Sequence, residues 1–283
     1  MRRWGVMTLA ITGSTGALGG AVARLLADLS PRLVVRDASR APAIDGSEVV
    51  VAGYADDDAA VRALTGVDTL FMVSGAEAVD RRAQHRGFVA AAARAGVGHI
   101  VYTSFAGAAT DATFTLGRDH HDTEDAIAAS GMRATLLRDN FYAEVLPLFA
   151  DAEGVIRGPA GAGRVALVSR LDVADVAAAV LRSPAEHVGA TYELTGPEAL
   201  TLDEAARRAG AVLGRDLRFE DESVEEAYAS RRAAYDAEQW QLDAWVSTYT
   251  AIADGSTARV TDHVERVAEH PARTVEAALA AIA

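Results

Sequence analysis

The sequence predicts an α/β fold made of a doubly wound parallel sheet and a smaller α+β lobe at the C-terminal end. Two observations carry this prediction. Through the first half of the chain, short apolar runs rich in β-branched residues alternate with alanine-rich segments of helical spacing. After residue 138 the alternation stops, and a Gly- and Pro-rich loop at 158–163 separates two short strand candidates. With 283 residues, of which 50% are apolar, the chain is long enough for both parts.

The expected strands of the sheet are nearly continuous apolar runs, as parallel strands covered on both faces require. They lie at 7–12, 32–36, 47–52, 69–73, 99–103 and 134–138. The helices between them are expected at 17–27, 57–64, 81–95 and 120–129. Strand–helix alternation repeated this often indicates helices on both faces of one sheet.

The second half contains fewer strands and more helix signals. Residues 169–175 look like a cap that leads into an alanine-rich helix, and Thr201 with Glu204 forms a capping-box pattern. Strands are expected at 191–195 and 217–220. An acidic helical stretch follows and carries five aromatic residues, Tyr228, Tyr235, Trp240, Trp245 and Tyr249. Packing between helices is their expected role, and a lid over a flat substrate is the alternative.

The composition excludes several classes of function. A formal net charge of −13 disfavours a nucleic-acid partner, because neutralising phosphates requires a basic surface. The chain has no cysteine and no lysine, which rules out disulfides, thiolate nucleophiles, Schiff bases and a P-loop lysine. The apolar run in residues 1–10 is too short for a signal peptide, and no run approaches a membrane span. A cytoplasmic protein without a membrane partner is therefore expected.

The strongest motif is a glycine-rich turn between the first strand and the first helix. It contains Gly13, Gly16 and Gly19. The first glycine permits a positive φ, the second lets backbone amides approach a pyrophosphate, and the third brings the helix close to the strand. The anion would lie at the positive N-terminus of the helix. The motif predicts a Rossmann-type dinucleotide site.

The end of the second strand indicates which dinucleotide is bound. NAD-selective domains usually place an acid there for the ribose hydroxyls. This chain has Arg36 instead, with Arg40 close behind. Because an arginine pairs with a 2′-phosphate, NADP(H) is the expected cofactor. Asp37 is a counter-signal that keeps NAD(H) as the alternative.

Co-linear motifs along nearly the whole chain resemble the NmrA-like family of atypical short-chain dehydrogenases/reductases. Within it, the chain is most similar to the bacterial NAD(P)H:quinone oxidoreductase and triphenylmethane reductase type. Besides the glycine turn, the motifs lie at 35–36, 84–86, 99–104, 120–124, 136–138, 170–174 and 261–262. The resemblance implies a nucleotide-binding domain at 1–140, with 168–185 packing back on it. It also implies a substrate lobe at 141–283 whose last helix returns to the first domain.

The resemblance also implies which residues contact the cofactor. The glycine turn would cradle the pyrophosphate, and Arg36 would contact the adenosine phosphate. Thr103 and Ser104 would approach the nicotinamide, and the turn at 139–142 would lie between nicotinamide and substrate. The implied cofactor-binding residues are Gly13, Ser14, Thr15, Gly16, Ala17, Leu18, Arg36, Val73, Ser74, Gly75, Thr103, Asp139 and Asn140.

The sequence departs from the family pattern at three places. The Tyr-x-x-x-Lys proton relay of ordinary short-chain dehydrogenases aligns with Leu116 and His120. Relatives often carry Asn where this chain has Asp139, with Asn140 one residue later. The acid that often receives the adenine after the third strand is replaced around residues 53–54.

The leading hypothesis is hydride transfer from NADPH to a quinone-like small molecule, in which the protein holds donor and acceptor face to face. Ser104, Tyr142 or water would meet the acceptor oxygen. His120 would supply a proton, because imidazole titrates near neutral pH. Alternatively, His120 caps a helix or contacts the cofactor ribose.

Two other functions stay open. The missing Tyr-x-x-x-Lys pair motivates a redox sensor that binds NADP(H) and reports to a protein partner. An isomerase or epimerase that retains its cofactor is a weaker alternative. No metal site is expected, because His120 and Glu124 alone do not form one. A homodimer is compatible with the sequence.

Overall fold

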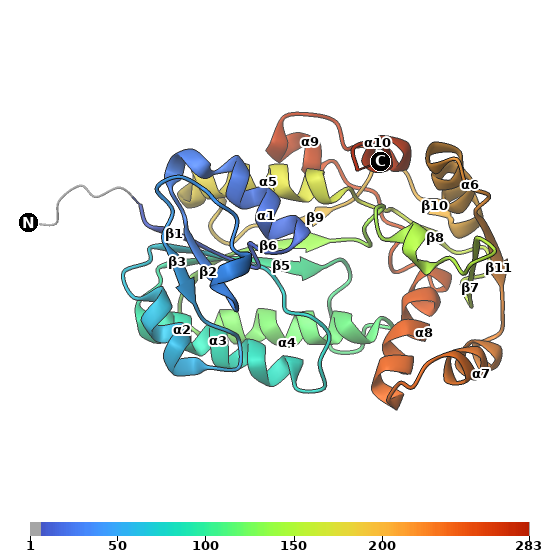
Figure 1. Cartoon of the computed structure of the whole chain (residues 1–283), viewed down its shortest axis with the longest axis horizontal. Coiled ribbons are helices and arrows are strands. Elements are labelled where there is room, and N and C mark those ends of the chain that lie inside the picture. Colours follow the sequence, from blue (N-terminus) through green and yellow to red (C-terminus); the bar gives the residue numbers. More distant parts are fainter. Residues whose placement is uncertain (1–6, 283) are drawn as a thin grey trace, which may run out of the picture. The chain divides into compact units, whose positions relative to one another are not determined.

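The computed structural model describes residues 7–282 and divides them into two units whose segments interleave along the chain (Figure 1). Unit 1 runs to Ser104 and adds His121–Leu137 and Val173–Tyr192. Unit 2 consists of Phe105–His120, Arg138–Asp172 and the chain from Glu193 onward. Residues 1–6, and with them most of the N-terminal segment considered for a signal peptide, lie outside the described residues. The functional boundary expected after residue 140 stays a prediction.

A seven-stranded sheet has the strand order β3-β2-β1-β4-β5-β6-β9. Its strands are β1 (Leu9–Thr12), β2 (Arg32–Val35), β3 (Val49–Val51), β4 (Thr69–Met72), β5 (His99–Phe105), β6 (Arg133–Asp139) and β9 (Thr191–Leu194). The pairs from β3 through β5 are parallel, and Ile11 aligns with both Leu33 and Phe71. The predicted doubly wound sheet is confirmed. Its order reverses at β1 and β4, the point where such sheets bind ligands.

Helices cover both faces of this sheet (Figure 1). One face carries α1 (Ala17–Leu25) and α5 (Arg170–Arg182), and the other carries α2 (Asp57–Leu64), α3 (Arg81–Ala95) and α4 (Thr115–Ala129). α4 begins earlier than the 120–129 segment expected. Gly117 lowers the helix propensity of this first turn. Leu116 nevertheless packs into an aromatic cluster there, and tertiary packing decides the boundary.

The core of unit 1 lies between the sheet, α2 and α3. Its largest fully buried side chains include Met72 on β4, Phe88 on α3 and Tyr102 on β5. Each such side chain contributes on the order of 1.5–3 kcal/mol when it leaves water. These buried runs hold the carboxyl ends of β1, β4 and β5 in register, and that edge of the sheet carries the predicted site.

Unit 2 combines helices with short strands, as expected for the α+β lobe, but it is about as large as unit 1 rather than smaller. It contains β7 (Val155–Gly158) parallel to β11 (Arg218–Asp221), and β8 (Arg164–Val165) antiparallel to β10 (Leu200–Thr201). Its helices are α6 (Leu202–Leu213), α7 (Val224–Ala234), α8 (Gln239–Ala253), α9 (His263–Ala268) and α10 (Val275–Ala280). Thr201 and Glu204 form the predicted capping box of α6. The buried residues of α10 pack in the core of unit 2. The expectation from the sequence was that this last helix returns to the 1–140 domain.

The aromatic stretch forms two helices, α7 and α8, and Tyr249 on α8 is buried. A Cβ atom at Gly158 would overlap the Tyr249 ring, so this residue of β7 has to be glycine. The Arg231 guanidinium lies 5.3 Å from the centroid of the same ring. For Tyr249, packing rather than a lid is therefore the role that the contacts support.

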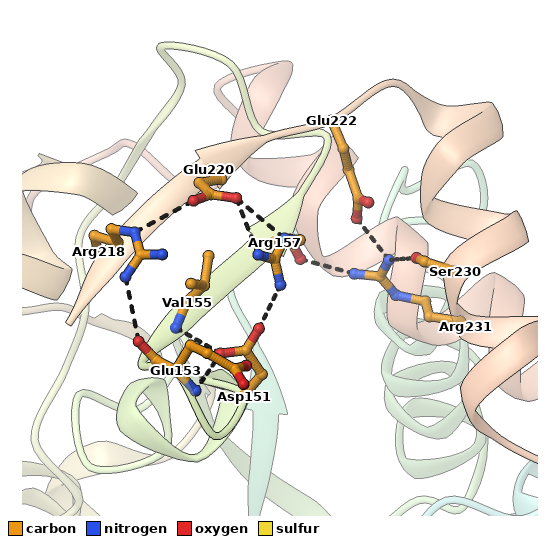
Figure 2. A network of polar contacts seen from close by, with 9 residues as sticks. All are labelled: Asp151, Glu153, Val155, Arg157, Arg218, Glu220, Glu222, Ser230 and Arg231. Atoms are coloured by element: carbon orange, nitrogen blue, oxygen red, sulfur yellow. Dashed lines mark hydrogen bonds and ion pairs between the residues drawn. The ribbon is translucent and has the colours of Figure 1, made fainter. Parts of the chain in front are cut away.

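Arginine–carboxylate pairs border β7 and β11 (Figure 2). Arg157 pairs with Asp151 and with Glu220, and these side chains are about one third or more exposed. Arg231 binds Glu222 at 2.7 Å and donates to the Arg157 carbonyl at 2.9 Å. The Arg231 and Glu222 side chains are only 12% and 10% exposed. This pair is the largely buried part of the network, and removing one partner would leave the other charge uncompensated.

Candidate functional site

The glycine turn has the backbone geometry that its motif requires. Gly13 adopts a φ of +66°, and a Cβ atom there would lie 3.0 Å from the Val73 Cβ atom. A Cβ atom at Gly19 would overlap the Gly13 carbonyl oxygen. Both positions therefore require glycine, the first for its left-handed conformation and the second for the close approach of α1 to β1.

The N-terminus of α1 is an uncapped helix end. Its N-cap is Gly16, no side chain caps it, and the first turn contains no acid. The first amides of a helix have no partners within the helix and carry a partial positive charge. Beside them, the Ser14 hydroxyl oxygen is buried and has no hydrogen-bond partner among residues 7–282. An anion held at these amides would supply that missing partner, so the turn fits a pyrophosphate.

The end of β2 presents a cation without a carboxylate partner. Arg36 is exposed and makes no hydrogen bond or ion pair with another residue in the described part of the chain. The counter-signal, Asp37, is engaged locally. Its carboxylate accepts hydrogen bonds from the Ser39 hydroxyl at 2.7 Å and from the Ser39 amide at 2.9 Å, which lower the pKa of Asp37. Asp37 thus caps a short turn, while the Arg36 guanidinium faces solvent.

The loop after β4 is held by hydrogen bonds from three consecutive amides. Val73 N donates to Thr12 Oγ1 at 2.9 Å, and Ser74 N donates to Thr103 Oγ1 at 2.7 Å. Gly75 N donates to His85 Nε2 at 2.9 Å. The loop is therefore tied to β1, β5 and α3 together, at the edge of the sheet where the glycine turn lies.

His85 completes this arrangement as a neutral ring with one defined tautomer. Because Nε2 accepts the Gly75 hydrogen, Nδ1 must carry the proton and donate it to Thr123 Oγ1, 2.9 Å away. Burial, aided by the charge of Arg81, lowers the pKa of His85 to about 3. His85 belongs to the 84–86 motif, but nothing in the sequence indicated a role for it. Only its position between two distant elements explains it.

Tyr54 stands where relatives often carry an acid for the adenine, and it has a structural role here. Its hydroxyl donates to the Val73 carbonyl at 2.5 Å and lies 2.7 Å from Thr12 Oγ1. Its ring packs on Phe88 with centroids 4.3 Å apart. Through these contacts Tyr54 supports the loop at 73–75. Burial raises the pKa of the Tyr54 hydroxyl above its ordinary value.

Ser104, at the end of β5, is fully buried. Its hydroxyl donates to Glu124 Oε1 at 2.5 Å, and Glu124 is only 8% exposed. The hydroxyl hydrogen is committed to this bond, so a contact with an acceptor oxygen would have to compete with it. The role proposed for Ser104 at the acceptor stays a prediction.

The carboxyl ends of β5 and β6 are joined, because Ala106 N donates to the Asp139 carbonyl at 2.8 Å. The Tyr142 hydroxyl donates to Asp139 Oδ2. Burial raises the pKa of Asp139 to about 7, against the Tyr142 hydrogen bond, which lowers it. Burial and the neighbouring Asp139 charge raise the pKa of Tyr142 well above its ordinary value. Arg170 lies over the Tyr142 ring, 5.1 Å from its centroid.

Asn140 is buried next to this pair, but its amide is occupied. Its Nδ2 donates to the Thr257 carbonyl at 2.8 Å, and its Oδ1 accepts from Phe141 N at 2.8 Å. Both ends of the amide therefore serve the backbone. The cofactor contact expected for Asn140 stays a prediction.

An aromatic cluster of Phe105, Phe114 and Phe141 was not predicted. Its ring centroids are 4.7 to 5.1 Å apart, and Leu116 packs against it. His120 is 7% exposed, with its ring 6.2 Å from Phe105. The three phenylalanines lie in different connecting segments, at the end of β5, just before α4 and just after β6, so no local pattern indicates that they meet. They provide flat apolar surfaces beside His120.

The structure thus gathers the predicted residues into two groups. Unit 1 holds the glycine turn, Arg36, the loop at 73–75, Thr103 and Ser104 at the carboxyl edge of its strands. Unit 2 holds Asp139, Asn140, Tyr142 and His120. A pocket of about 560 Å³ in unit 2 is lined by residues 197, 259–263, 265 and 271–272, none of them predicted site residues. Within residues 7–282, no helix is both long and apolar enough to cross a membrane.

Comparisons with known proteins agree with this geometry. The model of the NmrA-like family matches residues 6–264. Quinone oxidoreductase 2 of Escherichia coli is 37% identical over 222 residues, 75% of this chain and 77% of that protein. A (4-alkanoyl-5-oxo-2,5-dihydrofuran-3-yl)methyl phosphate reductase of Streptomyces griseus is 36% identical and covers 93% of each chain.

Solved structures give the same picture. An Escherichia coli NADPH-dependent quinone oxidoreductase complexed with NADPH superimposes with a TM-score of 0.87 at 31% identity, over 97% of this chain and 99% of that one. The triphenylmethane reductase of a Citrobacter species, complexed with NADP(H), gives a TM-score of 0.83 at 28% identity. That match covers 96% of this chain and 99% of the other. The family resemblance read from the sequence is confirmed.

Proposed function

This chain belongs to the NmrA-like family, and on that premise we propose that it is an NADP(H)-dependent reductase of quinone-like or other electron-poor small molecules. The observation that carries the proposal is the uncapped N-terminus of α1, with the buried and unpartnered Ser14 hydroxyl beside it. The relatives named above are reductases, and two of their solved structures contain NADPH or NADP(H). Arg36 supports NADP(H) over NAD(H), which stays the alternative cofactor.

In this proposal the residues of unit 1 bind and orient the dinucleotide. The amides from Gly13 to Leu18 hold the pyrophosphate, and Arg36 pairs with the 2′-phosphate. The loop at 73–75, fixed by Thr103 and His85, borders the nicotinamide. When bound, NADPH supplies the hydride. Fixing the loop in advance limits the ways in which the ring can sit, which is how a protein lowers the barrier of a reaction between two bound molecules.

Unit 2 contributes the groups that would act on the acceptor. The cluster of Phe105, Phe114 and Phe141 suits a flat apolar molecule. His120 and Tyr142 are the candidate proton donors, and Ser104 is a third polar candidate from unit 1. Leu116 replaces the tyrosine of ordinary short-chain dehydrogenases, so the proton must come from another group. We propose that the protein is cytoplasmic. A homodimer is compatible with this proposal.

The first experiment is a fluorescence titration with NADPH and NADH, followed by a panel of quinones, azo dyes and triphenylmethane dyes. Oxidation is followed by the loss of the reduced nicotinamide absorbance. Tight NADPH binding with rapid, acceptor-dependent oxidation supports the reductase. Tight binding without oxidation of any acceptor favours the redox sensor, which would change its assembly or partner affinity instead. Failure to bind either nucleotide contradicts the proposal at its base.

A further inference from the structure

Asp139 and Tyr142 form an isolated acid–phenol pair directly after β6. The Tyr142 hydroxyl donates to Asp139 Oδ2, and Asp139 is 6% exposed. No arginine in the described part of the chain forms an ion pair with Asp139. A buried carboxyl group without a cation prefers its neutral form. We propose that the two side chains are a proton relay for the reduced acceptor, in which Asp139 stores the proton and Tyr142 delivers it.

This inference rests on the proposed reductase function and gives that reaction its proton source. The pair lies at the carboxyl end of β6, in the same sheet as the strands that carry the glycine turn and the 73–75 loop. The Ala106–Asp139 backbone bond joins the ends of β5 and β6 there. Doubly wound sheets bind their ligands at the carboxyl ends of their strands, and the pair follows such an end, which favours a role in the reaction.

The neighbouring charged groups, Arg170 and Glu144, are not part of the proposed relay. Arg170 faces the Tyr142 ring at 5.1 Å, and its charge favours the ionised phenol. Glu144 acts in the opposite direction, but its carboxylate is occupied by the Arg170 amide at 2.9 Å and the Ser169 hydroxyl at 2.9 Å. Glu144 therefore partly offsets the effect of Arg170 on the Tyr142 pKa. The pKa of Asp139, raised to about 7 by burial, means that the store is partly filled at neutral pH.

The relay balances the reaction. Hydride transfer from NADPH gives the acceptor two electrons and one hydrogen nucleus, which leaves a negative charge on an acceptor oxygen. When Asp139 is protonated, its O–H donates to the Tyr142 oxygen in place of the bond that Tyr142 donates in the structure, which frees the Tyr142 proton. The Tyr142 O–H bond then breaks as its proton passes to the acceptor oxygen. The Asp139 O–H bond breaks as its proton restores the phenol. The Asp139 carboxylate then takes a proton from water, and no other reductant or oxidant is needed.

The test uses Asp139→Asn and Tyr142→Phe in the full chain, with NADPH and one quinone. In the wild type, kcat should fall as the pH rises above about 7, because Asp139 loses the proton that it would supply to Tyr142. Asp139→Asn should lose this limb, and each variant should lower kcat by about 10²-fold or more. The double variant should be no slower than either single one, because both remove the same step. Tyr142→Phe should leave NADPH affinity unchanged.

A matched control is the second tyrosine–aspartate pair, on α7 and α8. There, the Tyr228 hydroxyl donates to Asp243 Oδ1 at 2.8 Å. Tyr228→Phe and Asp243→Asn make the same chemical changes and should leave both kcat and its pH profile unchanged. A general effect of removing such a pair would appear in these variants as well.

Infrared spectroscopy tests the protonation state of Asp139 without turnover. Infrared difference spectra of wild type against Asp139→Asn should show a protonated carboxyl group that titrates near neutral pH. In Tyr142→Phe this titration should move to higher pH, because the phenol hydrogen bond stabilises the carboxylate. The relay would be overturned if kcat of Asp139→Asn still fell above about pH 7, or if the rate losses of the two single variants multiplied in the double variant. It would also be overturned if the Asp139 carboxyl group were ionised throughout the neutral pH range. Wild-type protein that oxidises no NADPH at any pH would instead overturn the proposed function, and the relay with it.

Discussion

The Ser104 hydroxyl donates to the Glu124 carboxylate across 2.5 Å, and this bond links the end of β5 to α4 inside unit 1. Both side chains are buried. Such a bond does two things at once. It gives a buried carboxylate a hydrogen-bond donor, and it fixes the strand end that the family resemblance predicts to lie at the nicotinamide.

Ser104→Ala should therefore lower the free energy of unfolding by about 1–3 kcal/mol, because Glu124 loses a buried donor. Urea unfolding measures this, with Ser130→Ala as the control, since that hydroxyl bonds two backbone groups, the Ile127 carbonyl and the Met132 amide, rather than a carboxylate. If Ser104 also meets the acceptor, kcat falls in the folded variant as well. A stability equal to that of wild type would show that the bond contributes nothing to folding.

Gly19→Ala should weaken NADPH binding by about tenfold or more, since forcing α1 away from β1 misplaces the amides that hold the pyrophosphate. The added methyl group would overlap the Gly13 carbonyl oxygen. Gly98→Ala is the control. Its Cβ atom would lie 3.3 Å from the Asp68 carbonyl, before β5 begins, and should not change affinity. Fluorescence titration distinguishes the two variants, and equal affinities would contradict the role of the turn.

Arg36→Ala should raise the Kd for NADPH by about 10- to 100-fold, because a charge-assisted contact with the 2′-phosphate is lost. The Kd for NADH should stay nearly the same, since NADH lacks that phosphate. Arg62→Ala on α2 removes another exposed arginine and serves as the control for net charge. A parallel loss of affinity for both nucleotides would place Arg36 elsewhere than at the 2′-phosphate.

His120 is the alternative to Tyr142 as the proton donor, and if its imidazole donates the proton, His120→Ala should lower kcat by about 10²-fold while NADPH affinity changes little. Its buried position beside Phe105 is consistent with a donor to a flat acceptor. The neighbouring His121→Ala, which removes a ring that pairs with Asp125, should leave kcat unchanged. Equal losses in kcat and affinity would assign His120 to cofactor binding only.

The raised pKa of Asp139 also makes a prediction about stability. Its folded-state pKa of about 7 lies above the ordinary 3.8, so the folded protein binds the proton more tightly than the unfolded chain. The contribution of Asp139 to the free energy of unfolding is therefore complete below pH 3.8. It is lost as the pH rises from 3.8 to about 7. The loss is about 4 kcal/mol at most.

Asp139→Asn lacks this titration, so its stability relative to wild type should increase as pH rises from 3.8 toward 7. Denaturant unfolding at several pH values measures the difference. His85 and His99, whose pKa values are lowered to about 3 and about 4, act in the opposite direction. Both are present in each protein and cancel in the comparison. A difference that does not depend on pH would contradict the raised pKa.

Much of the fold could be predicted because its signals are local. The apolar runs located β1, β2, β4 and β6 to within one or two residues, since a buried parallel strand must be apolar on both faces. The glycine turn was also predictable, because its backbone demands leave only one residue type at Gly13 and Gly19. Reading α4 from residue 120 was wrong, because the packing of Leu116 outweighs the propensity of Gly117.

The supports of the site could not be predicted in this way. The bond between Gly75 and His85 and the bond between Tyr54 and Val73 join residues from different elements. No periodicity or spacing in the sequence encodes such a pairing, and each emerges only when the sheet order is known. The use of Asn140 by the backbone is a further case, since its partner Thr257 lies 117 residues away.

The interleaving of the two units has a consequence for how the protein is made. Unit 1 needs Val173–Tyr192, which is translated after two segments of unit 2. A ribosome that has released only the first 140 residues has therefore not yet released all of unit 1. Unit 1 cannot be complete as an early, independent product of synthesis, so its final folding should follow the synthesis of the unit 2 segments that interrupt it in the sequence.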